Sequence, residues 1–402
     1  MVPIGSIYGG AMWQAARLAL GTASALGLAR FAYGLLVPAM RDDLGWTLTE
    51  AGAMSTANGL GYLLGALVTA AVVRGWGVTA AFRGGLVGTA VALAATALSA
   101  DFAVLLVVRA AAGAAGAVVF IAGGVIASRI ATRVGSGTPI TVYFAGTGLG
   151  IAFGGVTIPL LGSGWRVAWV VLAVAAVAAA LVAWTAARAG GEAPAATSGR
   201  PRLRPLWRIA VAYTLFALGY ITYITFLSAY LVERDAPTWQ VVLTWVALGL
   251  AVVAAPALWS RPIANWPGSR APAALLGVLG GGAALALVAP TPTVILGSAL
   301  VYGATFMGVP AAVTAIVRDA VPTADLTATL AAFTTLFAAG QTAGPWLVGV
   351  VADRTSTDAT LAWTAVLCAA AAVIVVSPRR RRTARRAPRP RPAVPARPRR
   401  GS

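Results

Sequence analysis

The stretch GLARFAYGLLVPAM, residues 27–40, ends an apolar run that begins near residue 18 and is long enough to cross a bilayer as a helix. Arg30 falls near the middle of this run, where a guanidinium group costs about 2.5–3.5 kcal/mol on insertion scales. Helical spacing places four residues on one face of the helix: Gly27, Arg30, Tyr33 and Gly34. We therefore expect this face to line a polar, watery interior, with the rest of the chain forming the wall around it.

The composition indicates an integral membrane protein. Hydrophobic residues make up 59% of the 402 residues and charged residues only 10%, against about 25% charged residues in a soluble domain. The mean hydropathy is +0.83. The net charge of +19 is due to arginines, many of which lie in a tail at 378–402 that alternates Arg with Pro. We expect this tail to be disordered and to lie near anionic lipid headgroups, with no nucleic-acid partner.

Twelve apolar runs separated by short polar or Gly/Pro breaks predict an all-α membrane protein with twelve transmembrane helices in two six-helix halves. The runs lie at about 18–40, 51–73, 82–100, 102–127, 139–161, 167–187, 207–231, 239–259, 272–289, 294–316, 327–350 and 360–377. Continuous apolar runs without alternation exclude a β-barrel. The predicted organisation is an N-terminal half (1–187), a central loop (188–205), a C-terminal half (206–377) and the tail (378–402).

Arginines near the helix ends predict the orientation. Most of them flank the loops that follow even-numbered spans, the central loop and the tail, whereas Arg41, Arg166, Arg234 and Arg354 mark the other side. The positive-inside rule then places both termini and the central loop in the cytoplasm. The first apolar run is too long for a cleavable signal peptide. We expect a monomeric, multi-pass protein of the bacterial cytoplasmic membrane.

The two halves repeat each other's pattern. The glycine row of the fifth span, within residues 146–155, returns in the eleventh span within residues 340–349. Residues 27–31 of the first span align in the same way with residues 219–223 of the seventh. Such a parallel repeat is typical of transporters whose substrate path lies between the halves. The glycine rows themselves predict close helix packing.

These features resemble the major facilitator superfamily over nearly the whole chain, to about residue 377. Arg109 followed by Gly113 resembles the superfamily's fourth-helix motif. The fifth-helix glycines resemble a motif often associated with exporters, although Ile151 stands where that motif has proline. Residues 27–40 together with residues 58–65 are similar to the YbfB/YjiJ-type branch. The resemblance implies the twelve-helix fold and alternating access, and it implies no particular substrate.

Candidate substrate contacts are the polar groups predicted within the spans. Arg30 and Arg109 are expected about 16 and 12 Å from the outer helix ends, and none of the eleven acids falls deep within a helix. Because an unpaired buried arginine is costly, an anionic substrate is one source of the missing countercharge; the alternative is bonding to backbone carbonyls. The remaining candidates are neutral, with interhelical hydrogen bonding as their alternative role: Tyr33, Asn58, Thr222, Tyr223, Tyr302 and Gln341.

The sequence predicts a secondary transporter for a small organic anion or for an amphipathic metabolite with a carboxylate. An exporter of hydrophobic drugs is the alternative within transport, and a membrane receptor or enzyme is the alternative from another class. The absence of histidine and lysine, and of deep acids, argues against an enzyme, a metal site or a cofactor. Without a deep carboxylate to carry a proton, facilitated diffusion, anion exchange and proton movement with the substrate stay open. We expect exchange to survive neutralisation of any single acid, Asp319 and Asp353 included.

Overall fold

The computed structural model describes residues 4–188 and 199–376, and helices are the only regular secondary structure in these ranges. Twelve helical spans are long and apolar enough to cross a membrane, as the sequence predicted. Most of the predicted central loop and the whole predicted tail lie outside the described residues. The first half contains α1 (Ile4–Thr22), η1 (Ala23–Phe31), α2 (Tyr33–Leu44), α3 (Leu48–Trp76), α4 (Val78–Leu98), α5 (Phe102–Val134), α6 (Thr138–Leu160) and α7 (Trp165–Trp184). The second contains η2 (Arg204–Leu206), α8 (Trp207–Val232), α9 (Thr238–Asn265), α10 (Arg270–Val288), α11 (Pro292–Phe306), α12 (Gly308–Ala320), α13 (Thr323–Arg354) and α14 (Asp358–Val376).

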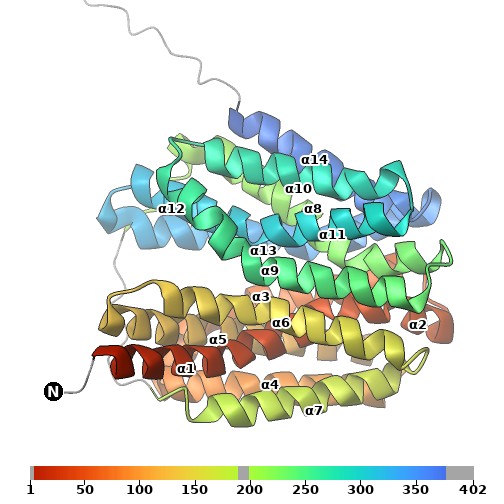
Figure 1. Ribbon diagram of the computed structural model, residues 1–402, viewed down its shortest axis with the longest axis horizontal. Helices are drawn as coiled ribbons and strands as arrows, with labels where there is room; N and C mark the ends of the chain where they lie inside the picture. Colours follow the sequence, from red (N-terminus) through yellow and green to blue (C-terminus); the bar gives the residue numbers. More distant parts are fainter. Residues whose placement is uncertain (1–3, 189–198, 377–402) are drawn as a thin grey trace, which may run out of the picture.

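The spans form two bundles that lie side by side. In Figure 1, α1–α7 (red to yellow-green) make the lower bundle and α8–α14 (green to blue) make the upper one. Across the boundary α6 packs on α9, α3 packs on α13 and α2 packs on α8. The fifth span therefore meets the eighth, and the eleventh meets the second. Spans five and eleven are six spans apart, and so are spans two and eight. The two contacts are therefore equivalent in the two halves, as a repeat of six spans requires.

Glycines let the first and fifth spans of each half approach closely. A Cβ added to Gly150 of α6 would come within 2.8 Å of the Gly27 Cα in η1. In the second half, a Cβ added to Gly344 of α13 would collide with the carbonyl oxygen of Leu218 in α8. The two glycine rows thus allow the same close helix packing in the two halves, as the sequence predicted.

The two halves contact each other from the middle of the bundle to one of its ends, which we call the outer end. This end holds the turns at residues 45–47, 161–164 and 233–237, which the sequence predicts to lie outside. Here Arg41 of the first half forms a 3.6 Å salt bridge with Glu233 of the second. Asp353 of α13 accepts the backbone N–H groups of Leu48 (2.8 Å) and Thr49 (2.9 Å) at the start of α3. The outer end is therefore closed by charged groups from both halves.

The opposite end, which we call the inner end, is less tightly joined along α3 and α13. Near the outer end of α3, a Cβ on Gly52 would collide with the Pro345 carbonyl of α13. Further along α3 the exposed fraction rises to 53% at Leu64 and 63% at Leu67. On α13 the matching inner segment exposes Thr334. The boundary between these two helices is therefore packed in its outer part and exposed in its inner part.

Two spans differ from their predicted form. The first span is helical from Ile4 rather than from about residue 18, and its inner end is held by Gln14 and Arg17, which donate to carbonyls of Ala186 (2.8 Å) and Val182 (2.7 Å). Hydropathy alone does not report these polar contacts. The tenth span is divided at Met307 between α11 and α12. Pro310, three residues later, has no N–H to donate to a carbonyl of the preceding turn, which interrupts the helix.

Candidate functional site

Arg30 lies in a π-helical segment, Ala23–Phe31, in the middle of the first span. At the end of this segment the Ala32 N–H donates to the carbonyl of Gly27, five residues earlier, at 2.9 Å. This five-residue spacing is that of a π-helix. All nine residues of the segment are buried. Single π turns inside longer helices occur frequently at functional sites. The segment also changes the direction in which the following side chains project.

The expectation that Gly27, Arg30, Tyr33 and Gly34 share one face is therefore wrong. Gly27 packs against Gly150 of α6 inside the first half, whereas a Cβ on Gly34 would collide with an α8 carbonyl of the second half. Tyr33 donates its hydroxyl to a backbone carbonyl of α3 at 2.8 Å. The assumed spacing of an α-helix does not hold across the π segment, because that segment inserts a residue into the turn.

Arg30 meets the second half through a glutamine. Its Nη2 donates to Gln341 Oε1 of α13 at 2.7 Å, and the Tyr220 hydroxyl of α8 donates to the same oxygen at 2.8 Å. Arg30 is 8% exposed and Gln341 is fully buried. Within residues 4–188 and 199–376, no Asp or Glu forms a salt bridge with Arg30. The positive charge is thus met by a neutral amide dipole.

Aromatic rings from both halves surround this polar group. The guanidinium carbon of Arg30 lies 5.2 Å from the centroid of the Tyr62 ring of α3, close enough for a cation–π interaction. On the other side, Tyr220 stacks on Phe337 of α13 with centroids 5.4 Å apart. We call Arg30, Tyr62, Tyr220 and Gln341 the cross-half site. It combines one cation, one amide and two phenols, whose rings supply the aromatic faces.

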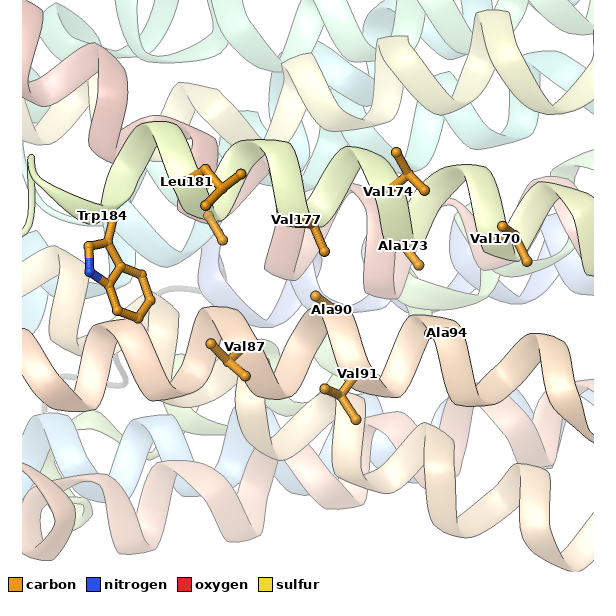
Figure 2. A pocket seen from close by; sticks show the side chains of 11 residues that line it. Val87, Ala90, Val91, Ala94, Val170, Ala173, Val174, Val177, Leu181 and Trp184 are labelled. Atoms are coloured by element: carbon orange, nitrogen blue, oxygen red, sulfur yellow. The ribbon is translucent and has the colours of Figure 1, made fainter.

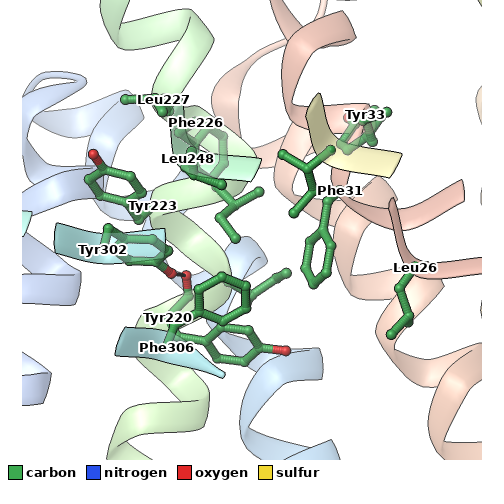
Figure 3. Packing of buried hydrophobic residues seen from close by; sticks show 14 of the residues in the cluster. Leu26, Phe31, Tyr33, Tyr220, Tyr223, Phe226, Leu227, Leu248, Tyr302 and Phe306 are labelled. Carbon is green, nitrogen blue, oxygen red and sulfur yellow. Dashed lines mark hydrogen bonds between the residues drawn. The ribbon is translucent and has the colours of Figure 1, made fainter. Parts of the chain in front are cut away.

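The aromatic cluster continues across the boundary and into the second half. Phe31 and Phe306 meet edge to face at 6.0 Å, and Figure 3 shows Phe31 reaching towards the rings of the second half. Behind Phe306, Tyr223 and Tyr302 are stacked with centroids 4.0 Å apart. Tyr223 pairs with Ser298 at 2.7 Å, and Tyr302 donates to a backbone carbonyl of α8. The structure therefore places these two predicted residues in the packed layer behind the cross-half site.

Arg109 lies inside the first half, with 1% of its surface exposed. Its Nη1 donates to the carbonyl of Ala29 in the π segment at 2.6 Å. The guanidinium carbon lies 4.9 Å from the Tyr33 ring and 5.3 Å from the Trp169 ring. Nε and Nη2 have no hydrogen-bond partner. This arrangement matches the alternative of bonding to a backbone carbonyl, and neither Arg109 nor Tyr33 is part of the cross-half site.

Asn58 and Thr222 also make contacts within one half. Asn58 Nδ2 donates to the Arg109 carbonyl at 3.2 Å and so links α3 to α5. Thr222 donates to the Gly219 carbonyl at 2.6 Å and pairs with Thr364 of α14 at 2.9 Å. Of the predicted residues, Arg30 and Gln341 are the two that the structure places in the cross-half site, although they are 311 positions apart.

Sequence reasoning missed Tyr62 and Tyr220. For Tyr220 a signal was available, because Tyr213, Phe216 and Tyr220 are spaced three and four residues apart and so form an aromatic face on one helix. The structure confirms that face, with Tyr213 and Phe216 stacked at 6.0 Å and Phe216 and Tyr220 at 4.9 Å. The pairing of Tyr220 with an amide 121 positions away had no such signal.

Two grooves lie away from the cross-half site. One, of about 510 Å³, runs between α4 and α7 on the outside of the bundle, and Figure 2 shows its valine-rich lining ending at Trp184. Its apolar lining suits lipid chains. The other, of about 810 Å³, lies at the inner end of the second half and includes Trp207, Trp266 and Asp319. Among the described residues, no group of His, Cys, Asp and Glu is arranged to hold a metal ion.

Sequence comparison identifies the family. Residues 22–378 match the family described as "Uncharacterised MFS-type transporter YbfB". A chloramphenicol resistance protein from Streptomyces lividans is 29% identical over 291 residues, which cover 70% of this chain and 74% of that protein.

Solved transporter structures share the fold. A crystal structure of the nucleoside transporter NupG superposes with a TM-score of 0.68 at 14% identity, covering 91% of this chain and 98% of that one. A bacterial homologue of the human lysosomal transporter Spinster, in an inward-facing and unoccupied conformation, gives a TM-score of 0.67 at 13% identity, covering 94% and 95%. The chain is a multi-pass membrane protein of the major facilitator superfamily and belongs to its YbfB-type transporter family.

Proposed function

We propose that this protein is a secondary transporter that moves a small organic anion, or an amphipathic metabolite with a carboxylate, by alternating access. The observation that carries the proposal is that the buried charge of Arg30 has no acidic partner among the described residues. Its buried charge lies on the boundary between the halves with a neutral amide as its hydrogen-bonded partner. Desolvating a guanidinium without a countercharge is expensive, and a bound carboxylate would supply that countercharge through short, charge-assisted hydrogen bonds.

We further propose that the membrane is the bacterial cytoplasmic membrane, with the inner end and both termini in the cytoplasm. The distribution of arginines supports this orientation. Reporter proteins fused after residues 190 and 378 should then report the cytoplasm, and a fusion within 233–238 should report the outside. Opposite signals at 190 and 235 would overturn the orientation.

Alternating access gives the outer-end contacts a role. The Arg41–Glu233 salt bridge and the bonds from Leu48 and Thr49 to Asp353 join the two halves. For substrate to enter from the outer side, these contacts must separate. The proposed cycle therefore opens the outer end by breaking them and closes the inner end by bringing the exposed inner parts of α3 and α13 together.

The test is counterflow of labelled carboxylates in proteoliposomes. Arg30→Gln should cost about 2 kcal/mol or more of substrate affinity, because a hydrogen-bonded charge is removed. Arg30→Lys should bind weakly but still prefer anions, since it keeps the charge and loses the planar fork. The matched control is Arg83→Gln, a partly exposed arginine that donates to the Trp184 carbonyl within the first half. Normal affinity with a collapsed melting temperature in Arg30→Gln would show that Arg30 is structural.

Export of hydrophobic compounds is the second candidate. The Streptomyces lividans relative is a chloramphenicol resistance protein, and the aromatic stack of Tyr220 and Phe337 offers an apolar surface at the boundary. The two candidates differ in their dependence on Arg30. For an exporter of neutral compounds, Arg30→Gln should leave chloramphenicol efflux from cells intact, whereas Phe337→Ala should reduce it.

A further inference from the structure

We propose that the Gln341 carbonyl oxygen occupies the position of a substrate carboxylate oxygen, and that the substrate class is planar aromatic monocarboxylates. The inference rests on the function proposed above and narrows it. It is drawn from three features of the cross-half site: two donors that converge on one oxygen, a buried amide nitrogen without a partner, and aromatic faces beside the cation.

The two donors come from opposite halves. Arg30 Nη2 and the Tyr220 hydroxyl both donate to Gln341 Oε1, at 2.7 and 2.8 Å. Two donors on one atom also settle the orientation of the amide, because its nitrogen cannot accept either bond. A charged donor and a phenol that meet at one oxygen form the arrangement that binds a carboxylate oxygen. In the absence of an anion, the amide oxygen satisfies both donors.

The amide nitrogen gives a second, independent indication. Gln341 is fully buried, and its Nε2 has no hydrogen-bond partner. A buried donor without a hydrogen-bond partner is costly. The unpaired Gln341 Nε2 therefore indicates that a ligand accepts its hydrogen bond in another state of the protein. When a carboxylate takes over the bonds from Arg30 and Tyr220, the released amide can donate Nε2–H to the carboxylate. Arg30, Tyr220 and Gln341 would then all bind the same group.

The number of available cations sets the charge of the substrate. Arg30 is the cation of the cross-half site, and Arg109 is held within the first half by the Ala29 carbonyl and two aromatic rings. One negative charge therefore matches one available guanidinium. A second carboxylate would be desolvated without a partner, which is unfavourable.

The rings beside the cation favour a planar body. Tyr62 lies under the Arg30 guanidinium, and Tyr220 presents a ring that stacks parallel to Phe337, with an interplanar angle of 21°. A carboxylate held by Arg30 and Tyr220 brings the body of the substrate beside these faces. Phe216, Phe306 and Phe337 already stack on Tyr220, whereas Tyr62 is partly exposed. A planar ring can stack on the Tyr62 ring, and such stacking should strengthen binding about 2- to 10-fold over a non-planar body of similar size.

The test uses the purified full-length protein and three probes: benzoate, cyclohexanecarboxylate and benzamide. Calorimetry should show benzoate binding about 2- to 10-fold more tightly than cyclohexanecarboxylate, and benzamide should not bind measurably. Gln341→Glu provides Arg30 with a permanent carboxylate and should reduce benzoate affinity at least about 10-fold without lowering the melting temperature. Gln14→Glu, a glutamine that bonds within the first half, is the matched control and should bind like the wild type.

The outcomes separate the two proposals. Arg30-dependent binding of cyclohexanecarboxylate as tight as that of benzoate, or wild-type benzoate affinity in Gln341→Glu, overturns the inference and leaves an anion transporter in place. If neither these carboxylates nor a panel of aliphatic mono- and dicarboxylates bind in a manner that depends on Arg30, both the inference and the proposed function fail.

Discussion

Replacing Asp353 should open the outer end of the bundle while leaving substrate exchange in place. The Asp353 carboxylate accepts three hydrogen bonds from the first turn of α3: the Leu48 N–H at 2.8 Å, the Thr49 N–H at 2.9 Å and the Thr49 hydroxyl at 2.5 Å. A bond to a charged group contributes about 1.5–3 kcal/mol, and a carboxylate at a helix N-terminus contributes about 0.3–1 kcal/mol more. Because Asp353 is exposed, we discount the sum to about 2 kcal/mol.

That energy belongs to one conformation only. The bonds join α13 to α3, so they exist when the outer end is closed and are lost when it opens. Removing about 2 kcal/mol from the closed state shifts the equilibrium about 30-fold towards the open one. Asp353→Ala should give the full shift. Asp353→Asn keeps an acceptor oxygen without the charge and should give about half of the free energy, or about 5-fold.

The assay is labelling of a cysteine placed at the boundary. Ser55 of α3 is 8% exposed and lies 3.1 Å from the Thr225 hydroxyl of α8, so Ser55→Cys is covered while the outer end is closed. In a Cys368→Ala background, a membrane-impermeant maleimide added from outside should react faster by the factors given above.

The control is Asp43→Asn. Asp43 is also a carboxylate at the outer end, but it binds Trp165 (2.7 Å) and Arg166 (3.1 Å) of its own half. Its replacement should leave the labelling rate unchanged. Equal labelling of wild type, Asp353→Ala and Asp43→Asn would refute the assignment of Asp353 to outer-end closure.

Two further substitutions test the packing around the cross-half site. Arg109→Lys keeps the charge but loses the planar contact with two aromatic rings; it should lower stability by about 1–2 kcal/mol, seen as a lower melting temperature, with unchanged substrate affinity in the folded fraction. Gly34→Ala would drive a Cβ into the Ile224 carbonyl across the boundary, at a cost of about 1–3 kcal/mol, and should raise labelling of Ser55→Cys. Gly9→Ala, with no atom within 4 Å, should not lower stability and should leave the labelling unchanged.

The fold was predictable because a bilayer imposes a simple rule on each span. About twenty apolar residues are needed to cross it, so twelve apolar runs predict twelve spans, and the glycine rows indicate which spans pack closely. The ends of the spans were less predictable. The helix around Arg17 continues because its guanidinium donates to the Val182 carbonyl at 2.7 Å, a contact between residues far apart in the chain that hydropathy does not report.

Part of the site was predictable for an energetic reason. Arg30 and Gln341 are polar groups in apolar runs, and such groups are costly unless they find partners. Their mutual bond could not be predicted, because it depends on how the two halves dock. Tyr33 was misplaced because the π segment changes the side-chain direction after Arg30. Arg109 satisfied the same energetic criterion as Arg30, and the structure separates the two by their partners.

Under the proposed function, the position of the Arg30–Gln341 bond would connect substrate binding to the movement of the halves. A ligand shifts a conformational equilibrium only by its difference in affinity between the two states. An anion that replaces the amide oxygen on Arg30 and Tyr220 would be held by both halves at once, and its charge would lower the cost of burying Arg30 as the site closes around it. In this scheme the substrate supplies the negative charge that proton-coupled transporters keep on a membrane carboxylate. A transporter built in this way would need no deep acid, in keeping with the described residues 4–188 and 199–376, whose acids lie in loops or near helix ends.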